Sequence, residues 1–277
     1  MTNWLITGVG GGLGMALARA ALARGDKVAG TMRKASDLAA FEALAPGLAR
    51  GFLLDMRDEE AVRGTVDGAE AELGGLDILV NNAGYGLVGA VEEASLAEIR
   101  AQFEVNVFGP IAAIQAALPH FRRRRAGHII NVTSVSGVAT WAGTGVYCGS
   151  KFALEGVTQT LAQEIAELGI RLTNVEPGGM RTDYAGRSLI KTQAVIADYD
   201  GVARDAQRIL ADHAGHEPGD PAKIAQAILK IAGMDDPPLQ LLLGADAMLY
   251  ATRKLAQFQA EIGRWAPLSL STAFDAD

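Results

Sequence analysis

Short apolar runs alternate with longer amphipathic segments along almost the whole chain. Runs such as Ile78-Leu79-Val80 have no polar alternation, which is typical of strands covered on both faces of a parallel sheet. The pattern predicts seven strands, at residues 4–7, 27–31, 51–54, 76–80, 128–133, 171–175 and 239–243. It predicts helices at residues 14–24, 35–44, 59–73, 96–122, 147–168, 221–231 and 247–262.

This alternating order predicts an α/β fold of the Rossmann type, in which a doubly wound, mostly parallel seven-stranded sheet carries helices on both faces. No repeat, low-complexity tract or linker divides the chain, so we expect a single domain over residues 1–277. Residues at about 178–218 form a segment long enough for a substrate lid. Residues at about 244–277 form a C-terminal extension, expected to shape the pocket or a subunit contact.

A glycine-rich turn follows the first predicted strand. Its sequence, Thr7-Gly8-Val9-Gly10-Gly11-Gly12-Leu13-Gly14, stands between the apolar run Trp4-Leu5-Ile6 and an Ala- and Leu-rich helix. Strand, glycine turn and helix together are the context that a dinucleotide-binding loop requires. Glycine permits the tight turn and lets the backbone approach a pyrophosphate, which the N–H groups at the helix start can bind.

Tyr147 and Lys151 are four residues apart on a predicted helix, so their side chains lie on one face. A neighbouring ammonium favours the ionised form of a phenol, and this pairing suits general acid–base chemistry. The alternative is a surface Tyr–Lys pair on an amphipathic helix. Ser134, thirteen residues before Tyr147, and Asn106 further upstream favour the catalytic interpretation.

Composition and charge narrow the classes of function. Apolar residues make up 49% of the 277-residue chain, and the net charge of −7 disfavours nucleic acid as a partner. The single cysteine excludes an intramolecular disulfide and favours a reducing, cytoplasmic compartment. No apolar run approaches the length of a membrane span, and the first strand leaves no room for a signal peptide. The four histidines lack metal-ligand spacing, so we expect no metal.

These motifs resemble, in order, those of the short-chain dehydrogenase/reductase family, and the resemblance covers nearly the whole chain. The TGxxxGxG pattern is Thr7 to Gly14, NNAG is Asn81-Asn82-Ala83-Gly84, and YxxxK is Tyr147 to Lys151. The other matching positions are Asp55, Met56, Asn106, Ser134, Pro177, Gly178 and Thr182. The stretch around Tyr147 also resembles the 17β-hydroxysteroid and retinol dehydrogenase branch, but that likeness concerns the catalytic helix and not the substrate pocket.

The resemblance implies a role for each catalytic residue. Tyr147 would exchange a proton with the reacting oxygen, and Ser134 would hydrogen-bond the same oxygen. Lys151 would hold the cofactor ribose and support Tyr147, while Asn106 would position a water in a proton relay. Two alternatives stay open: Asn106 could bridge backbone groups in its own helix, and Ser134 could cap a turn.

The resemblance also implies a nicotinamide cofactor. Its contacts would come from Gly8, Gly12, Leu13, Gly14, Arg33, Asp55, Met56, Asn82, Ala83, Gly84, Tyr147, Lys151, Pro177, Gly178 and Thr182. At the end of the second strand, Met32 stands where an NAD-selective chain places an acid, and Arg33 follows it. An arginine there can pair with a 2′-phosphate, so we expect preference for NADP(H), with NAD(H) possible.

The substrate is expected to be a small molecule, a hydrophobic or aromatic ketone or secondary alcohol, contacted by Tyr85, Trp141 and Tyr184. These side chains could instead simply pack beneath the lid. The competing functions are a non-catalytic dinucleotide sensor, an epimerase or dehydratase, and an enoyl reductase. By the resemblance, we also expect a homodimer or homotetramer formed through the helices at residues 96–122 and 147–168.

Overall fold

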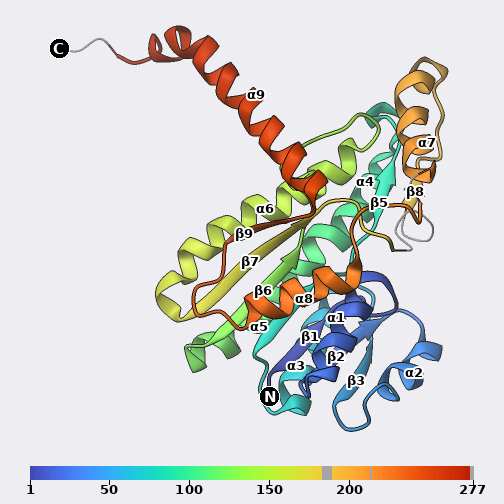
Figure 1. Cartoon of the computed structure of the whole chain (residues 1–277), viewed down its shortest axis with the longest axis vertical. Coiled ribbons are helices and arrows are strands. Elements are labelled where there is room, and N and C mark those ends of the chain that lie inside the picture. Colours follow the sequence, from blue (N-terminus) through green and yellow to red (C-terminus); the bar gives the residue numbers. More distant parts are fainter. Residues whose placement is uncertain (183–188, 213, 275–277) are drawn as a thin grey trace.

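Seven parallel strands form the central sheet of the computed structural model, which describes residues 1–182, 189–212 and 214–274 (Figure 1). The strand order is β3-β2-β1-β4-β6-β7-β9. In chain order the strands are β1 (Asn3–Ile6), β2 (Lys27–Met32), β3 (Ala49–Leu53), β4 (Ile78–Asn81), β6 (Gly127–Val132), β7 (Ile170–Pro177) and β9 (Gln240–Leu243). The sequence of crossovers reverses between β1 and β4, and this reversal places a crevice at the carboxyl edge of the sheet.

Helices cover both faces of the sheet (Figure 1). One apolar core lies under α1 (Gly12–Ala23), α2 (Leu38–Glu42) and α8 (Pro221–Ala232). The other lies under α3 (Glu59–Leu73), α5 (Gly109–Arg124) and α6 (Gly145–Ile165). The remaining helices are α4 (Leu96–Phe103), α7 (Asp205–Asp212) and α9 (Ala245–Leu270). The predicted fold class is therefore confirmed.

The helix predicted over residues 96–122 is interrupted. A π-helical turn at Glu104–Phe108, designated η3, separates α4 from α5. Pro110 explains the interruption, because it has no N–H to donate to the carbonyl of Asn106 four residues earlier. The ladder of helical hydrogen bonds must change at this point, and π turns of this kind commonly occur at functional sites.

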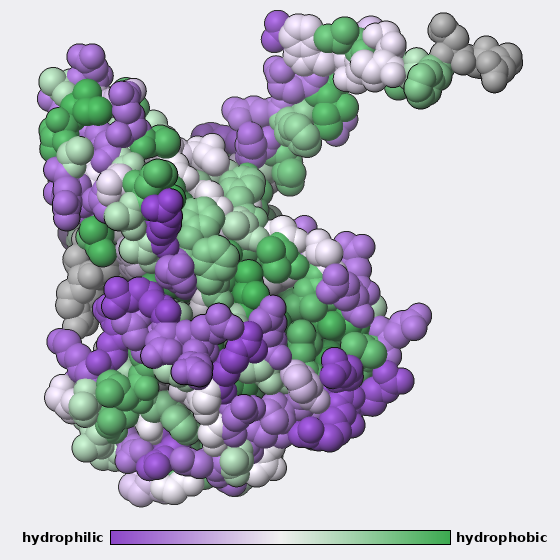
Figure 2. All heavy atoms as spheres, turned by 180° about the vertical axis from the view of Figure 1, so that it is seen from behind, coloured by the Kyte–Doolittle hydropathy of each residue, from purple (hydrophilic) through white to green (hydrophobic). Residues whose placement is uncertain are grey.

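Two features were not predicted. A second, two-stranded parallel sheet pairs β5 (Gly86–Val88) with β8 (Leu189–Lys191). Helix α9 is longer than the predicted residues 247–262 and projects away from the body (Figure 1). Its outer turns expose large apolar side chains, among them Leu255, Phe258 and Trp265. Figure 2 shows green patches on the projecting arm.

Three asparagines form a row across the middle of the sheet, which we call the amide row: Asn81 on β4, Asn131 on β6 and Asn174 on β7. All three are buried. The Asn81 Nδ2 donates to Asn131 Oδ1 at 2.9 Å, and the Asn131 Nδ2 donates to Asn174 Oδ1 at 3.0 Å. These bonds satisfy most of the polar atoms that the row buries.

None of the helices in the described part of the chain combines the length and apolarity needed to cross a membrane.

Candidate active site

The glycine turn between β1 and α1 leaves room for an anion. Gly8 and Gly12 have positive φ angles of 77° and 55°, which favour glycine. A Cβ at Gly14 would lie 2.4 Å from the Gly8 carbonyl oxygen, whereas a Cβ at Gly10 would meet nothing within 4 Å. No side chain caps the first turn of α1, so its N–H groups stay available. The turn therefore fits a dinucleotide pyrophosphate.

Side-chain hydrogen bonds tie the glycine turn to the NNAG segment. The Thr7 Oγ1 accepts the N–H groups of Asn82 and Ala83 at 2.9 and 3.0 Å. The Asn82 Nδ2 in turn donates to the carbonyl oxygens of Thr7 and Gly8 at 2.8 and 3.2 Å. The structure thus brings together Gly8, Gly14, Asn82 and Ala83, all predicted to contact the cofactor.

Lys151 is buried at the base of the site, and the residue as a whole is 6% exposed. Its Nζ donates to the Val132 carbonyl oxygen at 2.9 Å and lies 5.8 Å from the ring centroid of the half-buried Tyr147. Burial lowers the pKa of Lys151 to about 8, against the attraction of the Glu155 carboxylate. The predicted proximity of ammonium and phenol is present, since both residues lie in the first two turns of α6.

Asn106 lies in the π turn and bonds to residues outside its own helix. Its Oδ1 accepts the Tyr85 N–H at 3.1 Å, and its Nδ2 donates to the Tyr85 carbonyl at 2.9 Å and to Ser150 Oγ at 3.1 Å. A Cβ at Gly84 would lie 3.1 Å from Asn106 Oδ1 and 3.8 Å from Lys151 Nζ. Asn106 therefore holds the chain after NNAG beside the lysine, and the alternative of bridging its own helix does not apply.

Ser134 follows β6 and begins the short 3-10 turn η4 (Val135–Gly137). Its Oγ accepts the Ser136 N–H at 3.0 Å, so the turn-capping alternative is present in the structure. A hydroxyl has one proton and two lone pairs, and a cap of this kind uses one lone pair. Capping therefore orients Ser134 without excluding a hydrogen bond to a substrate oxygen.

The end of β2 presents a cation where an acid would select NAD. Met32 is buried, whereas Arg33 and Lys34 are exposed. The Asp55 carboxylate is bound by Arg57, whose Nε donates at 3.0 and 3.1 Å. The Arg57 hydrogen bond is the largest influence lowering the pKa of Asp55, and the charge of Arg33 acts in the same direction. Asp55 and Arg33 thus lie near each other at the carboxyl edge.

The side chains of Leu13 and Met56 are buried in the two apolar cores. If they contact a cofactor, as predicted, they must do so through the backbone.

The predicted Pro177, Gly178 and Thr182 lie near the same crevice. Pro177 ends β7, and the Thr182 side chain is 3.5 Å from the position of a Cβ at Gly12. A Cβ at Gly178 would lie 2.3 Å from the carboxylate of Asp246, which accepts the Gly179 N–H at 2.7 Å. Asp246 joins this segment to the base of α9, a long-range contact with no local signal in the sequence.

Two aromatic side chains pack together where the loop before α6 meets α9. The Trp141 ring meets the Tyr250 ring edge to face, with centroids 5.2 Å apart and an interplanar angle of 84°. Tyr250 is on α9 and was not predicted as a site residue. Tyr85 is partly buried, and burial raises the pKa of its phenol. Tyr184, the third predicted substrate residue, lies outside the described residues.

Residues 189–212, within the segment predicted as a lid, are attached to the body through Glu93, which follows β5. The Glu93 carboxylate accepts the N–H groups of Ile196 and Ala90 at 2.8 and 2.9 Å and forms an ion pair with Arg204. Arg204 and these N–H groups lower the pKa of Glu93 to about 2.

Further contacts extend this attachment. The Glu98 Oε1 accepts the Gln193 N–H at 3.0 Å, and the Tyr199 hydroxyl donates to Glu92 Oε2 at 2.6 Å. Strand β8 of the lid segment pairs with β5 of the body. Glu92, Glu93 and Glu98 therefore attach residues 189–204 to the segment that follows β5.

We predict that Glu93→Gln will loosen the lid segment. The amide keeps the shape of the side chain but removes the charge that binds Arg204. The KM for the substrate should rise several-fold, with little change in the KM for the cofactor, and limited proteolysis within residues 189–212 should accelerate. The control is Glu92→Gln, which alters one exposed contact. Equal changes in KM and in the proteolysis rate for the two variants would show that Glu93 does not hold this segment in place.

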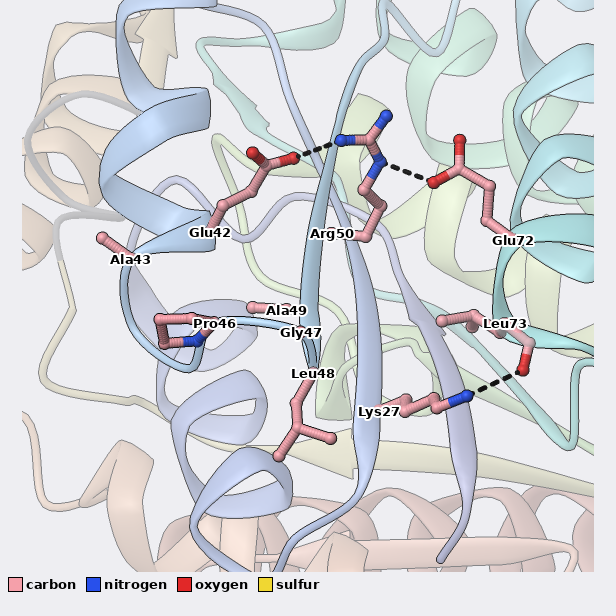
Figure 3. A pocket seen from close by; sticks show the side chains of 10 residues that line it. All are labelled: Lys27, Glu42, Ala43, Pro46, Gly47, Leu48, Ala49, Arg50, Glu72 and Leu73. Carbon is pink, nitrogen blue, oxygen red and sulfur yellow. Dashed lines mark hydrogen bonds and ion pairs between the residues drawn. The ribbon is translucent and has the colours of Figure 1, made fainter.

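A separate hollow lies at the opposite, amino edge of the sheet (Figure 3). There Arg50 bridges Glu42 and Glu72, and Lys27 donates to the Leu73 carbonyl oxygen. The polar groups in this hollow thus form ion pairs and hydrogen bonds with one another. Because open α/β sheets bind ligands at the carboxyl ends of their strands, we place the functional site at the crevice and not here.

Comparison with known proteins identifies the family. The family model for short chain dehydrogenase matches residues 2–192. The chain belongs to the short-chain dehydrogenase/reductase family. This dehydrogenase is therefore an oxidoreductase that acts on alcohol or ketone groups, as its motifs predicted.

Similar proteins match the dehydrogenase over most of its length. It is 38% identical over 272 residues to oxidoreductase BOA17 of Botryotinia fuckeliana, covering 98% of each chain. It is 36% identical to retinol dehydrogenase 8 of Bos taurus, covering 85% of this chain and 79% of that protein. The crystal structure of a short-chain dehydrogenase from Streptomyces avermitilis superimposes with a TM-score of 0.92 at 37% identity, covering 99% and 100%.

Solved structures also indicate the cofactor class. ElxO, solved with NADP bound, has a TM-score of 0.74 at 25% identity, covering 89% of this chain and 98% of that chain. A nicotinamide dinucleotide is thus the supported cofactor class for the dehydrogenase.

Proposed function

We propose that this dehydrogenase interconverts a hydrophobic or aromatic ketone and its secondary alcohol, with NADP(H) as cofactor and Tyr147 as general acid and base. The observation that carries the proposal is the buried Lys151 ammonium, 5.8 Å from the Tyr147 ring and held by the Val132 carbonyl. A cation fixed beside a phenol makes that phenol a better proton exchanger near neutral pH.

When bound, a nicotinamide dinucleotide would supply or accept the hydride. The side chains of the protein transfer the proton and bind the substrate oxygen. Tyr147 donates its hydroxyl proton to the substrate oxygen in reduction and takes it back in oxidation. Ser134, oriented by the Ser136 N–H, hydrogen-bonds the same oxygen and stabilises its developing charge. Asn106 keeps the segment after NNAG beside Lys151.

Apolar and aromatic groups support the substrate class. Trp141 and Tyr250 form an aromatic wall, and Leu87 and Val88 are buried beneath the lid segment. Retinol dehydrogenase 8, a relative, is named for an apolar alcohol. A screen of ketones and secondary alcohols that follows NADPH absorbance tests the proposal. Activity confined to sugar epimerisation or to carbon–carbon double bonds would overturn it.

Arg33→Ala should raise the KM for NADP(H) about tenfold to a hundredfold, the size expected for a lost charge-assisted hydrogen bond. The KM for NAD(H), which has no 2′-phosphate, should change little. Arg33 is exposed at the end of β2, and the residue before it is Met32 and not an acid. Arg19→Ala, an exposed arginine on α1, is the matched control. Equal effects of Arg33→Ala on both cofactors would assign Arg33 a structural role.

We also propose a cytoplasmic homodimer or homotetramer that associates through α4, α5 and α6. Exposed apolar side chains in this region support the contact, among them Phe108, Phe152 and Val157. Sedimentation of the purified chain tests the oligomeric state, and a monomer at micromolar concentration would contradict it.

A further inference from the structure

Two buried glutamates lie against each other beyond Lys151. Glu155 is one helical turn further along α6, Glu176 is on β7, and the two residues are 3% and 2% exposed. The Glu155 Oε2 accepts the Asn174 Nδ2 at 2.7 Å and the Gln159 Nε2 at 2.8 Å. This pair is joined to the amide row through Asn174, and neither glutamate was predicted from the sequence as a site residue.

The contact between the two carboxyl groups requires a proton. The Oε1 of Glu155 is buried, and no N–H or O–H of the described residues is bonded to it, while the Oε1 of Glu176 accepts the Gln240 Nε2 at 2.7 Å. The Glu176 carboxyl group lies beside that of Glu155. Because two carboxylates can only accept, a hydrogen bond between them needs one proton. Burial, followed by the charge of Glu155, raises the pKa of Glu176 to about 7.

We propose that Glu155 and Glu176 share one proton and are positioning residues for Lys151, because the one negative charge left on the pair is the buried counter-charge of its ammonium. This inference rests on the proposed function, in which Lys151 holds the cofactor and supports Tyr147. It adds a second layer to the site, one helical turn behind the lysine.

The other charged groups on the surrounding elements are engaged elsewhere. On β7, Arg171 donates to the Met234 carbonyl oxygen, and on α9, Asp246 accepts the Gly179 N–H. Strand β9 contributes the neutral Gln240. Turn η4 contributes Gly137, where a Cβ would lie 2.9 Å from the Glu155 Cγ, so the turn closes over the pair.

The shared proton makes the charge behind Lys151 depend on pH. Below about pH 7 the Glu176 carboxyl group holds its proton. As the pH rises through about 7, Glu176 ionises and a second negative charge appears. That charge favours the ammonium and holds Lys151 protonated to higher pH, against a burial that lowers its pKa to about 8.

Cofactor binding as a function of pH tests the effect on Lys151. In Glu155→Gln and in Glu176→Gln one carboxylate is lost, so Lys151 should lose its proton at lower pH. The fall in NADP(H) affinity at alkaline pH should therefore begin about one pH unit lower than in the wild type. Glu164→Gln, an exposed carboxylate on the same helix, should leave the profile unchanged.

Urea unfolding tests the shared proton without cofactor or substrate. Glu176 has a raised pKa in the fold, so the folded protein binds more protons than the unfolded chain between about pH 4.3 and about pH 7. The contribution of Glu176 to the free energy of unfolding should be fully present below about pH 4.3 and should be lost as the pH rises to about 7. Glu176→Gln, which keeps an amide N–H for Glu155, should lack this loss, whereas Glu164→Gln should retain it.

A Glu176→Gln protein whose unfolding and cofactor binding follow the wild-type pH dependence would overturn the inference. If Glu155→Gln does not fold, Glu176→Gln decides alone, because its amide replaces the protonated acid in shape and in hydrogen bonding. Failure of the proposed reaction in the substrate screen would leave the unfolding result intact. The two failures are therefore distinguishable.

Discussion

Replacing Tyr147 with phenylalanine should lower the kcat of ketone reduction at least about a hundredfold, the contribution typical of a general acid. The ring that lies 5.8 Å from the Lys151 Nζ is retained, so the packing of α6 and the dissociation constant of the cofactor should change little. Single-turnover reduction monitored by NADPH absorbance measures the chemical step, and fluorescence titration measures the dissociation constant.

Tyr199→Phe is the matched control for this experiment. It removes a phenol hydroxyl outside the catalytic group, one that donates to Glu92 Oε2 at 2.6 Å. Its kcat should stay near that of the wild type. Near-normal turnover by Tyr147→Phe would refute the proposed mechanism, even though the family assignment would stand.

Lys151→Met should weaken cofactor binding about tenfold to a hundredfold, as expected for loss of a charged hydrogen-bond donor, and should lower kcat as well. Methionine fills the space of the lysine stem but removes the ammonium that supports Tyr147. Because the pKa of Lys151 is about 8, the wild type should lose its advantage over the variant as the pH rises above that value.

The pH dependence of cofactor binding by Lys151→Met distinguishes loss of the lysine charge from loss of its packing. A cofactor-binding defect of the same size at every pH would indicate that the lysine acts through packing alone. Lys223→Ala, which removes an exposed lysine on α8, is the control and should match the wild type throughout.

The sheet was predictable because each central strand is a short apolar run with its own local signal. Ile78-Leu79-Val80 and Ile129-Ile130 are buried on both faces, as such runs require. The pairing of Tyr147 with Lys151 was equally predictable, since a spacing of four places both side chains on one helical face whatever the rest of the fold.

The remaining site contacts join residues far apart in the chain, and no local pattern marks them. Glu93 meets Arg204 across 111 positions, and Asp246 meets Gly179 across 67. In the sequence, Glu155 and Glu176 resemble ordinary surface acids. They are buried in the fold because α6 packs on β7. The cap that Ser134 forms is a local contact, and the sequence offered it as one of two alternatives for this residue.

The amide row also has a consequence for how the chain folds. Strands such as β4, β6 and β7, which carry apolar side chains on both faces, could shift their register by one residue with little loss of hydrophobic packing. A slip of β6 would turn Asn131 to the opposite face and leave the buried Asn81 Nδ2 without its acceptor, while Asn174 would keep its bonds to Thr158 and Glu155. A buried amide without a partner costs about 1–3 kcal/mol, so the row disfavours a misaligned sheet.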